Sequence, residues 1–579
     1  MQVNISYQAP HQHFINFELR LDVKQHQKLT LQLPAWRPGR YELGNFAKYI
    51  QNFQAFDEQG KEVAFNKLTK DAWEFACADI KELVVKYKFY AAELNAGSSF
   101  LDEDQLYINP VNCIPYIVGK ESGYTIDLDI PESYRVAWPL KQNEKGYWIA
   151  KDKEELYEAI LIASEKLQFD SFTCEGYKIN IWFNGGIKPF WRKLKRDFYR
   201  FTKEQIKAFG ELPVPEYHFM FQALPHRFYH GVEHTACTIC VLGPGSALMK
   251  GEGYEKLLGI SSHELYHTWN IKQIRPAEMQ PYDYTKENYT KLGYLAEGVT
   301  TYMGDVFLAK SNVFSWKQFV KTQEENLQKH KDNFGRYNYS VAESGFDSWL
   351  DGYELGIPNR TVSIYAEGAL CMLMLDVAIL KRSKGKKSLQ TLITELYHNF
   401  AKKGKGVSEA ELLEGFRRFA GDAAEEIIQK CLYGRTDYQE LLSSYLNDLG
   451  LKITTEDNPR ADMRLLGVKA LRNSGKEGKL IKTMVPNSIA DKAGIAVGDE
   501  ILSINGKEIS VSVAKTLDSI KEKSISLRVK KPLKKVNVEL SLGNETYYPV
   551  YKIQPIAKPS VAQKKLFTAW CGMDLEELT

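Results

Sequence analysis

The first part of the chain alternates apolar and polar residues with a period of two. The alternation is clearest at 17–23, 29–33, 85–89 and 126–130. One apolar face per segment predicts half-buried antiparallel strands. The run Pro-Ala-Trp-Arg-Pro-Gly at 34–39 has the composition of a turn. We therefore expect the N-terminal domain to be a β-sandwich.

The spacing of apolar residues changes after residue 168. Short apolar runs at 177–183, 217–223 and 235–241 predict strands, and longer segments between and after them have helical spacing. The polar run ITTEDNPRAD at 453–462 predicts a linker before a compact β-rich segment. The expected multidomain α+β organisation has a β-sandwich at 1–168, an α+β domain at 169–325, an α-helical domain at 326–455, a β-rich domain at 460–545 and a tail at 546–579. The sequence LFTAWCGMDLEEL in the tail predicts a short docking helix.

The composition is that of a folded protein without a strong charge bias. Of 579 residues, 44 % are hydrophobic and 26 % are charged, and the formal net charge is +3. Proteins that bind nucleic acid or membrane surfaces usually carry a basic excess, so neither partner is expected. The N-terminus MQVNISYQAP lacks the features of a signal peptide, and no segment has 18 consecutive apolar residues, which favours a cytoplasmic location.

The eight Cys residues are spread irregularly and include one C-x-x-C pair, Cys237 and Cys240. No second pair accompanies it, and its flanks have the pattern of a strand. We expect buried free thiols rather than a metal or redox site.

The segment His263-Glu264-Leu265-Tyr266-His267 is an H-E-x-x-H motif. In a helix, its two His residues lie four positions apart on one face, so both imidazoles can reach one ion. Glu264 then lies near the ion, where a general base is needed to activate water. A catalytic zinc site takes three protein ligands and leaves one position for water, so a third ligand is expected.

Glu297 is the candidate third ligand. It lies among apolar residues in the helical segment GYLAEGVTTY at 293–302. A buried carboxylate needs a partner, which either a zinc ion or a basic side chain supplies. With zinc as the partner, His263, His267 and Glu297 form a His₂Glu site for one Zn²⁺ ion.

Several segments together resemble the glycyl aminopeptidase family, which is peptidase family M61. They are LPAWRPGRYELGNFAKYI at 33–50, FYHGVEHTACTICVLGP at 228–244, HELYHTWNIKQIRPAE at 263–278, LAEGVTTYMGD at 295–305 and SIYAEGALCMLMLD at 363–376. The resemblance implies that the domain at 169–325 is a thermolysin-like catalytic domain of the gluzincin type. It also implies an aminopeptidase that removes small residues, Gly or Ala, from the N-terminus of peptides.

The resemblance implies roles for residues outside the zinc motif. Glu233 would bind the α-amine of the substrate, since a buried carboxylate selects a free N-terminus through a charge-assisted hydrogen bond. Gly231, on the strand that binds the substrate backbone, stands one residue nearer to Glu233 than in related aminopeptidases. Tyr365 would donate its phenol hydrogen to the oxyanion. Glu367 stands where those enzymes have Lys, and Arg275 either pairs with a site carboxylate or substrate or forms a structural salt bridge.

The segment SIADKAGIAVGDEILSING at 488–506 resembles a PDZ domain of the type found in bacterial proteases. A short helix, a Gly turn and a strand that ends in Asn-Gly fit this domain. The run LLGV at 465–468 lies where a PDZ domain binds the C-terminus of a peptide through backbone N–H groups. The domain either binds such a peptide or packs as an accessory without a ligand.

Together these features predict a zinc-dependent aminopeptidase that acts on peptide substrates, with Glu264 as the general base. Two alternatives remain open. One is an endopeptidase or dipeptidase of the same fold, in which Glu233 has a structural role. The other is a catalytically weak protein that binds peptides through its PDZ domain, against which the intact H-E-x-x-H motif and Glu297 argue.

Overall fold

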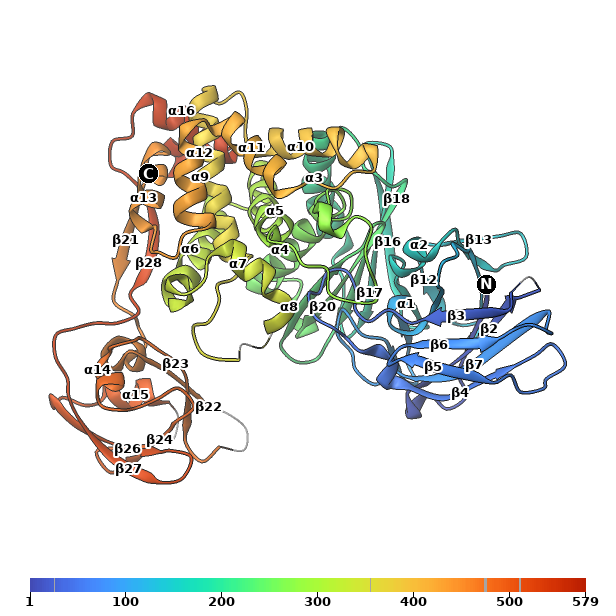
Figure 1. Ribbon diagram of the computed structural model, residues 1–579. Helices are drawn as coiled ribbons and strands as arrows, with labels where there is room; N and C mark the ends of the chain where they lie inside the picture. The colour runs from blue at the N-terminus through green and yellow to red at the C-terminus, as the bar shows by residue number, and fades with distance from the viewer. Residues whose placement is uncertain (25, 353, 355, 473–475, 510–511, 579) are drawn as a thin grey trace. The chain divides into compact units, whose positions relative to one another are not determined.

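The structure is a computed structural model that describes every residue except 25, 353, 355, 473–475, 510–511 and 579 (Figure 1). The chain divides into two compact units. Unit 1 comprises Met1–Ser315, Phe346–Tyr353 and Leu389–Gly415. Unit 2 comprises Trp316–Gly345, Glu354–Ser388 and Phe416–Thr579.

Unit 1 begins with two facing β-sheets, whose first strands along the chain are drawn in blue in Figure 1. The larger sheet contains, in spatial order, β13 (Lys141–Gln142), β14 (Trp148–Ala150), β11 (Tyr124–Asp129), β1 (Gln2–Ser6), β2 (Phe14–Asp22), β7 (Glu82–Tyr90) and β4 (Ile50–Phe56). The smaller sheet contains β10 (Tyr116–Ile117), β3 (Lys28–Gln32), β6 (Ala72–Ala76) and β5 (Phe65–Thr69). A third sheet contains β12 (Arg135–Ala137), β15 (Leu161–Ser164), β9 (Leu106–Ile108) and β8 (Phe100–Leu101), and two short helices, α1 (Pro110–Cys113) and α2 (Lys153–Tyr157), accompany it.

The alternation of apolar residues places one face of these strands in a common core. Phe17 of β2 lies opposite Tyr87 of β7, and their rings stack with centroids 5.2 Å apart. Leu31 of β3 and Phe75 of β6, from the smaller sheet, belong to the same buried cluster. Two sheets that share one core form a sandwich, so the predicted N-terminal fold is confirmed.

The rest of unit 1 is a fourth sheet covered by helices. The sheet contains, in spatial order, β16 (Gln168–Cys174), β17 (Tyr177–Gly185), β18 (Glu216–Ala223), β20 (Cys237–Gly243) and β19 (Phe228–Glu233). The helices are α3 (Trp191–Phe209), α4 (Gly251–His267), α5 (Val299–Lys310), α8 (Ser348–Asp351) and α10 (Leu389–Asn399). Helix α4 packs on β19 and β20, and α3 packs on β16. Because β19 runs antiparallel to β20 at the end of the strand order, it is the edge strand on this side of the described sheet.

Unit 2 contains a helical region and a further β domain. Its helices include α6 (Trp316–Asp332), α9 (Ala366–Ser383), α12 (Asp422–Ile427), α13 (Gln439–Asp448) and α16 (Val561–Cys571), while α7 (Val341–Phe346) and α11 (Glu409–Ala420) have residues in both units. Helix α9 is buried over most of its length and packs against α6, α12, α13 and α16. The prediction of a helical region is confirmed, and α16 is the docking helix expected near the C-terminus.

The prediction of a linker at 453–462 is wrong. Residues Leu451–Glu456 form β21, which pairs along its whole length with β28 (Val550–Pro555). Only Leu451 and Ile453 of this strand are apolar, so the alternation was too short to predict a strand. The ladder joins the segments on either side of the β domain in the sequence.

The β domain of unit 2 has its own core. Its sheet contains, in spatial order, β22 (Val468–Arg472), β23 (Lys479–Met484), β24 (Glu500–Ile504), β26 (Ser524–Lys530) and β27 (Lys535–Ser541), with β25 (Lys507–Glu508) paired to β24. Two short helices, α14 (Ile489–Lys492) and α15 (Val513–Asp518), complete it. Ser488 caps α14 by accepting a hydrogen bond from the N–H of Asp491, and Gly494 follows that helix with φ of +77°. This order of helix, Gly turn and strand agrees with the PDZ-like pattern in the sequence.

Candidate metal centre

The two His residues of the H-E-x-x-H motif lie one helical turn apart on α4. Their Nε2 atoms are 3.0 Å from each other. Helix α5 approaches α4 closely at Gly304, where a Cβ atom would lie 3.1 Å from Cα of His263. The absence of a side chain at 304 therefore permits the packing that places α5 next to the ligands.

Glu297 lies in a π-helical turn, η5 (Tyr294–Gly298), that leads directly into α5. Such turns insert an extra residue into the helical repeat and occur often at functional sites. Oε2 of Glu297 is 3.6 Å from Nε2 of His263 and 3.4 Å from Nε2 of His267. The structure thus brings together the three side chains predicted as metal ligands.

The spacing of these atoms fits a tetrahedral zinc site. Ligand atoms at zinc-bonding distance are about 3.3 Å apart in a tetrahedron. The three observed separations, 3.0, 3.4 and 3.6 Å, lie around that value. Oε2 of Glu297 is buried and has no hydrogen-bond partner, so a cation is the partner that its charge requires.

A further set of hydrogen bonds orients the ligands. Nδ1 of His267 lies 2.8 Å from the backbone carbonyl oxygen of Asn270, so Nδ1 donates and Nε2 is left to bind a metal. The side-chain amide of Asn270 donates to the carbonyl oxygen of Leu295 at 2.7 Å and to Oγ1 of Thr300 at 3.0 Å. Asn270 therefore connects the loop after α4 to the turn that carries Glu297. Sequence reasoning missed this residue, whose only signal is its place three positions after His267.

The buried charges of the site stabilise one another. Burial raises the pKa of Glu297, but the imidazoles of His267 and His263 outweigh it and lower the pKa to about 2. Burial lowers the pKa of His267, but the carboxylates of Glu297 and Glu233 outweigh it and raise the pKa to about 9. Glu297 is therefore held as an anion, which is the form that binds a cation.

Glu264 lies beside the ligands in a dry environment. Its side chain is buried, and its Oε2 has no hydrogen-bond partner. Burial raises the pKa of Glu264 well above its usual value, and the charges of Glu233 and Glu297 add to this rise against the opposing charge of His267. Gly231 of β19 borders Glu264, because a Cβ atom at 231 would overlap its Oε1. A carboxylate with a raised pKa suits a general base at neutral pH.

Glu233 ends the edge strand β19 next to the candidate metal ligands. Its side chain is 4 % exposed, and its carboxylate belongs with Glu264 and His267 to a group whose ligand-type atoms all lie within 4.8 Å of one another. In the register of β19 with β20, Gly231 lies opposite Cys240 and Glu233 opposite Thr238. Both residues that the resemblance assigned to substrate binding thus border the candidate metal centre, and their roles remain predictions.

A buried ion pair supports the turn that follows Glu233. Nζ of Lys272 donates to Oε1 of Glu158 at 2.6 Å, and Oε2 of Glu158 accepts from the N–H of Thr235 at 2.9 Å. The ring of His234 lies 3.7 Å from the same carboxylate. Sequence reasoning missed this network, since its members come from distant segments and form no motif.

Arg275 and the C-x-x-C pair have structural roles. Arg275 pairs with Glu154 and its guanidinium lies 4.2 Å from the centroid of the Tyr282 ring, which is the structural alternative of the two considered. All eight Cys residues are buried. Burial raises the pKa of Cys237 to about 12 and that of Cys240 well above its usual value, so both thiols remain protonated.

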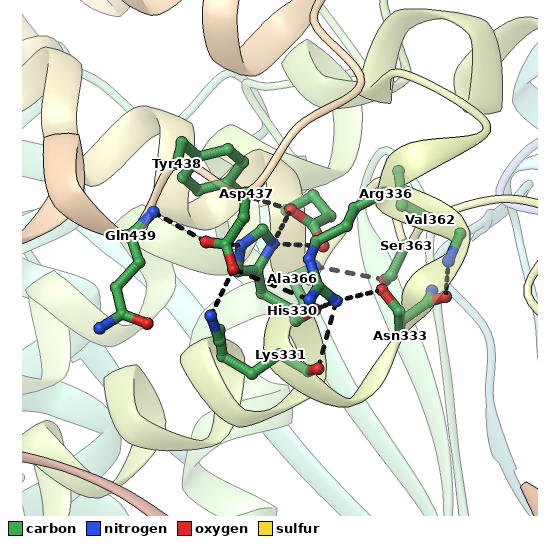
Figure 2. Close-up of polar contacts among 12 residues, drawn as sticks. His330, Lys331, Asn333, Arg336, Val362, Ser363, Ala366, Asp437, Tyr438 and Gln439 are labelled. Carbon is green, nitrogen blue, oxygen red and sulfur yellow. Dashed lines mark hydrogen bonds and ion pairs between the residues drawn. The ribbon is translucent and has the colours of Figure 1, made fainter. Parts of the chain in front are cut away.

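Glu367, which stands where Lys was expected, is buried in unit 2. It contacts a polar cluster that includes His330, Asp437 and Tyr438, which Figure 2 shows. Nδ1 of His330 lies 2.8 Å from Oε2 of Glu367, and Nε2 of the same ring lies 3.6 Å from Oδ1 of Asp437. Tyr438 donates to the Glu367 carboxylate and stacks on His330. Glu367 therefore anchors the first turn of α9. Tyr365 is the residue that precedes this helix, and its role at the oxyanion remains a prediction.

The run LLGV of the PDZ-like domain is engaged in hydrogen bonds within the chain. Its first two residues are the last two of η9 (Asp462–Leu466), and the N–H of Gly467 donates to the carbonyl oxygen of Met463 at 3.1 Å. On β22, the N–H of Ala470 donates to Oδ2 of Asp462 at 3.0 Å, and its carbonyl oxygen accepts from Nη2 of Arg460 at 3.0 Å. A peptide that pairs with this edge therefore has to displace the ion pair of Arg460 and Asp462.

Three family models match successive parts of the chain. They are the Peptidase M61 N-terminal domain at 2–164, M61 glycyl aminopeptidase at 256–371 and a PDZ domain at 480–531. Among solved structures, an aminopeptidase N family protein from Idiomarina loihiensis is 23 % identical, with a TM-score of 0.90 over 98 % of this chain and 99 % of that chain. An M1 zinc metallopeptidase from Deinococcus radiodurans is 15 % identical, with a TM-score of 0.48 over 75 % of this chain and 94 % of that chain. No curated protein matches the chain.

These matches agree with the arrangement of the site. The segment matched by the M61 glycyl aminopeptidase model contains His263, Glu264, His267 and Glu297. The shared fold with the Idiomarina protein extends over nearly the whole chain. Within the described part of the chain, no helix combines the length and apolar character needed to cross a membrane. The chain is a metallopeptidase whose residues 2–164 and 256–371 match the two models of the M61 glycyl aminopeptidase family and whose C-terminal part carries a PDZ domain.

Proposed function

We propose that this protein is a zinc-dependent aminopeptidase that removes a small N-terminal residue, Gly or Ala, from peptides. The observation that carries the proposal is the buried carboxylate of Glu233 beside the metal ligands. The α-ammonium group of a free N-terminus gains a charge-assisted hydrogen bond there. A blocked N-terminus would leave the carboxylate buried without its partner, which is unfavourable. The preference for Gly or Ala rests on the family resemblance.

The residues around the metal centre divide the chemistry between them. His263, His267 and Glu297 would hold one zinc ion, which supplies polarisation of the scissile carbonyl and acidification of water. Glu264 accepts the proton of the attacking water and passes it to the leaving amine. For Tyr365, the family resemblance implies that its phenol would donate a hydrogen bond to the oxyanion.

Glu233→Gln tests the amine-binding role, because it keeps the size of the side chain and removes its charge. We expect kcat/KM for glycyl and alanyl substrates with a free amine to fall about 10- to 100-fold more than for N-acetylated equivalents. Glu216→Gln is the matched control, since Glu216 lies in the same sheet and pairs with Lys178. Equal losses on free and blocked substrates would contradict the amine-binding role and favour an endopeptidase or dipeptidase.

A further inference from the structure

A turn of the N-terminal sandwich reaches the carboxylate of Glu233. The turn is Arg37-Pro38-Gly39-Arg40, part of a segment that the sequence comparison singled out and that the proposed chemistry does not use. Gly39 has φ of +82°, and a Cβ atom there would lie 2.5 Å from Oε2 of Glu233. The backbone of this turn therefore lies directly against one side of the carboxylate.

The turn is fixed to the part of unit 1 that carries the metal ligands. The N–H of Ala35 donates to the carbonyl oxygen of Tyr284 at 2.7 Å, and Nε1 of Trp36 donates to the carbonyl oxygen of Asp283 at 2.7 Å. These two acceptors lie in the loop between the H-E-x-x-H helix and the turn of Glu297. The position of the turn next to the site is thus set by bonds that do not involve Glu233.

On the side away from Glu233, the turn is tightly packed. Arg37 is 3 % exposed, and its guanidinium lies so near Gly97 that a Cβ atom at 97 would overlap it. Burial, together with the charges of Arg37 and Arg40, lowers the pKa of His230 to about 3. The positive charges of Arg37 and Arg40 therefore act on His230 of β19, the residue immediately before Gly231. The turn has little freedom to move away from the edge strand.

We propose that Gly39 is a positioning residue of the amine-binding site. Because Gly39 has no side chain, the turn packs directly against Glu233. The backbone of the turn then keeps the carboxylate oriented toward the candidate metal ligands. Fixing one orientation of a flexible Glu side chain before substrate arrives lowers the entropy lost on binding. This inference rests on the proposed role of Glu233. It makes the N-terminal sandwich part of the substrate site, although the three predicted metal ligands lie outside it.

Gly39→Ala tests the positioning role against a matched variant, Gly60→Ala. Gly60 lies in the same sandwich with the same φ of +82° but has no atom within 4 Å of the added Cβ position. Both variants carry the same backbone strain, and only Gly39→Ala collides with a carboxylate. We expect Gly39→Ala to raise KM for free-amine glycyl substrates about 10-fold, with kcat and zinc content nearly unchanged. Gly60→Ala should change KM less than about twofold.

A double-mutant cycle with Glu233→Asp shows whether the effect passes through Glu233. The shorter Asp side chain makes room for the methyl group, so Gly39→Ala should change KM less than about twofold in that background. An undiminished effect of Gly39→Ala there would overturn the proposal. If Gly39→Ala alone does not fold, recovery of folded protein in the double variant supports the contact, and an unfolded double variant overturns it.

Glu233→Gln separates failure of this inference from failure of the proposed function. If Glu233→Gln selectively weakens free-amine substrates while Gly39→Ala behaves like Gly60→Ala, the positioning role is wrong and the proposed function stands. If Glu233→Gln affects free and blocked substrates alike, amine binding by Glu233 is wrong, and the positioning role with it. Selective loss in both Glu233→Gln and Gly39→Ala, with Gly60→Ala unaffected, is the result that the inference predicts.

Discussion

The backbone carbonyl oxygen of Asn270 lies 2.8 Å from Nδ1 of His267. Through its side-chain amide, the same residue donates to the backbone of the π-turn that carries Glu297. Asn270 therefore fixes the orientation of His267 and also holds it close to the segment that carries Glu297. Such outer contacts of a metal site set its affinity although they do not touch the ion.

Asn270→Ala should weaken metal binding without unfolding the protein. We expect zinc affinity to fall about 10- to 100-fold, because the amide bridge between the two ligand segments is lost. Competition with a chromogenic chelator measures this directly. Asn288→Ala is the control, since Asn288 is also buried and its side-chain amide donates to the backbone carbonyl oxygens of Asp283 and Lys286. Equal zinc affinity in the two variants would show that Asn270 does not organise the site.

Glu264→Gln should abolish turnover while zinc remains bound. The amide cannot accept a proton, and a positioned general base contributes about 10²- to 10⁴-fold to rate. We expect kcat to fall by that factor with unchanged zinc content, measured by metal analysis and amide hydrolysis. Glu255→Gln, on the same helix, should keep its activity. Loss of zinc in Glu264→Gln would mean that Glu264 serves the metal rather than the proton transfer.

The pair of His330 and Glu367 should make the stability of the helical region depend on pH. Burial lowers the pKa of His330, but the carboxylates of Glu367 and Asp437 outweigh it and hold the pKa above its usual value of 6.5. The folded state then binds the proton more tightly than the unfolded state. The stabilisation is full below about pH 6.5 and is lost as the pH rises through the folded-state pKa.

His330→Gln measures this contribution. The free energy of unfolding should fall by about 3 kcal/mol relative to the unsubstituted protein at pH 5.5, since removing one member of a buried pair leaves the other charge unpaired. The difference should shrink as the pH is raised to 9 in denaturant titrations. His226→Gln, at an exposed position, should show no such trend. If the difference in the free energy of unfolding between His330→Gln and the unsubstituted protein grew with pH, it would contradict a raised pKa of His330 in the folded state.

The ion pair of Arg460 and Asp462 should protect the edge of β22 in the PDZ domain. In hydrogen exchange, we expect the amide of Ala470 to exchange slowly and to accelerate at least about 10-fold in Asp462→Ala. Asp518→Ala is the control, because Asp518 forms a surface pair with Arg464 in the same domain. Fast exchange of Ala470 in the unsubstituted protein would show that the edge is open to a peptide strand.

The three candidate metal ligands could be found in the sequence because their arrangement is mostly local. The four-residue spacing of His263 and His267 places both on one helix face, and Glu297 stood out as a carboxylate among apolar residues. The contact of Asn270 with Leu295 depends on a π-turn, for which the sequence shows no pattern.

Contacts between distant segments account for the other features that the sequence did not show. The approach of Gly39 to Glu233 brings the N-terminal sandwich to an edge strand of the next sheet. The pairing of the strand that begins at Leu451 could not be predicted either, because its partner strand, which ends at Pro555, lies beyond the PDZ domain in the sequence. Periodicity describes which face of a segment is buried but not which distant segment covers it.

The proposed activity is the metal-dependent removal of N-terminal residues from peptides. The direct test is hydrolysis of glycyl and alanyl chromogenic amides by the purified protein as isolated, after a chelator, and after zinc is added back. We expect the chelator to abolish hydrolysis and about one equivalent of zinc per chain to restore it, but not in Glu297→Ala. Hydrolysis that persists after all metal is removed, or none when zinc is bound, would contradict it.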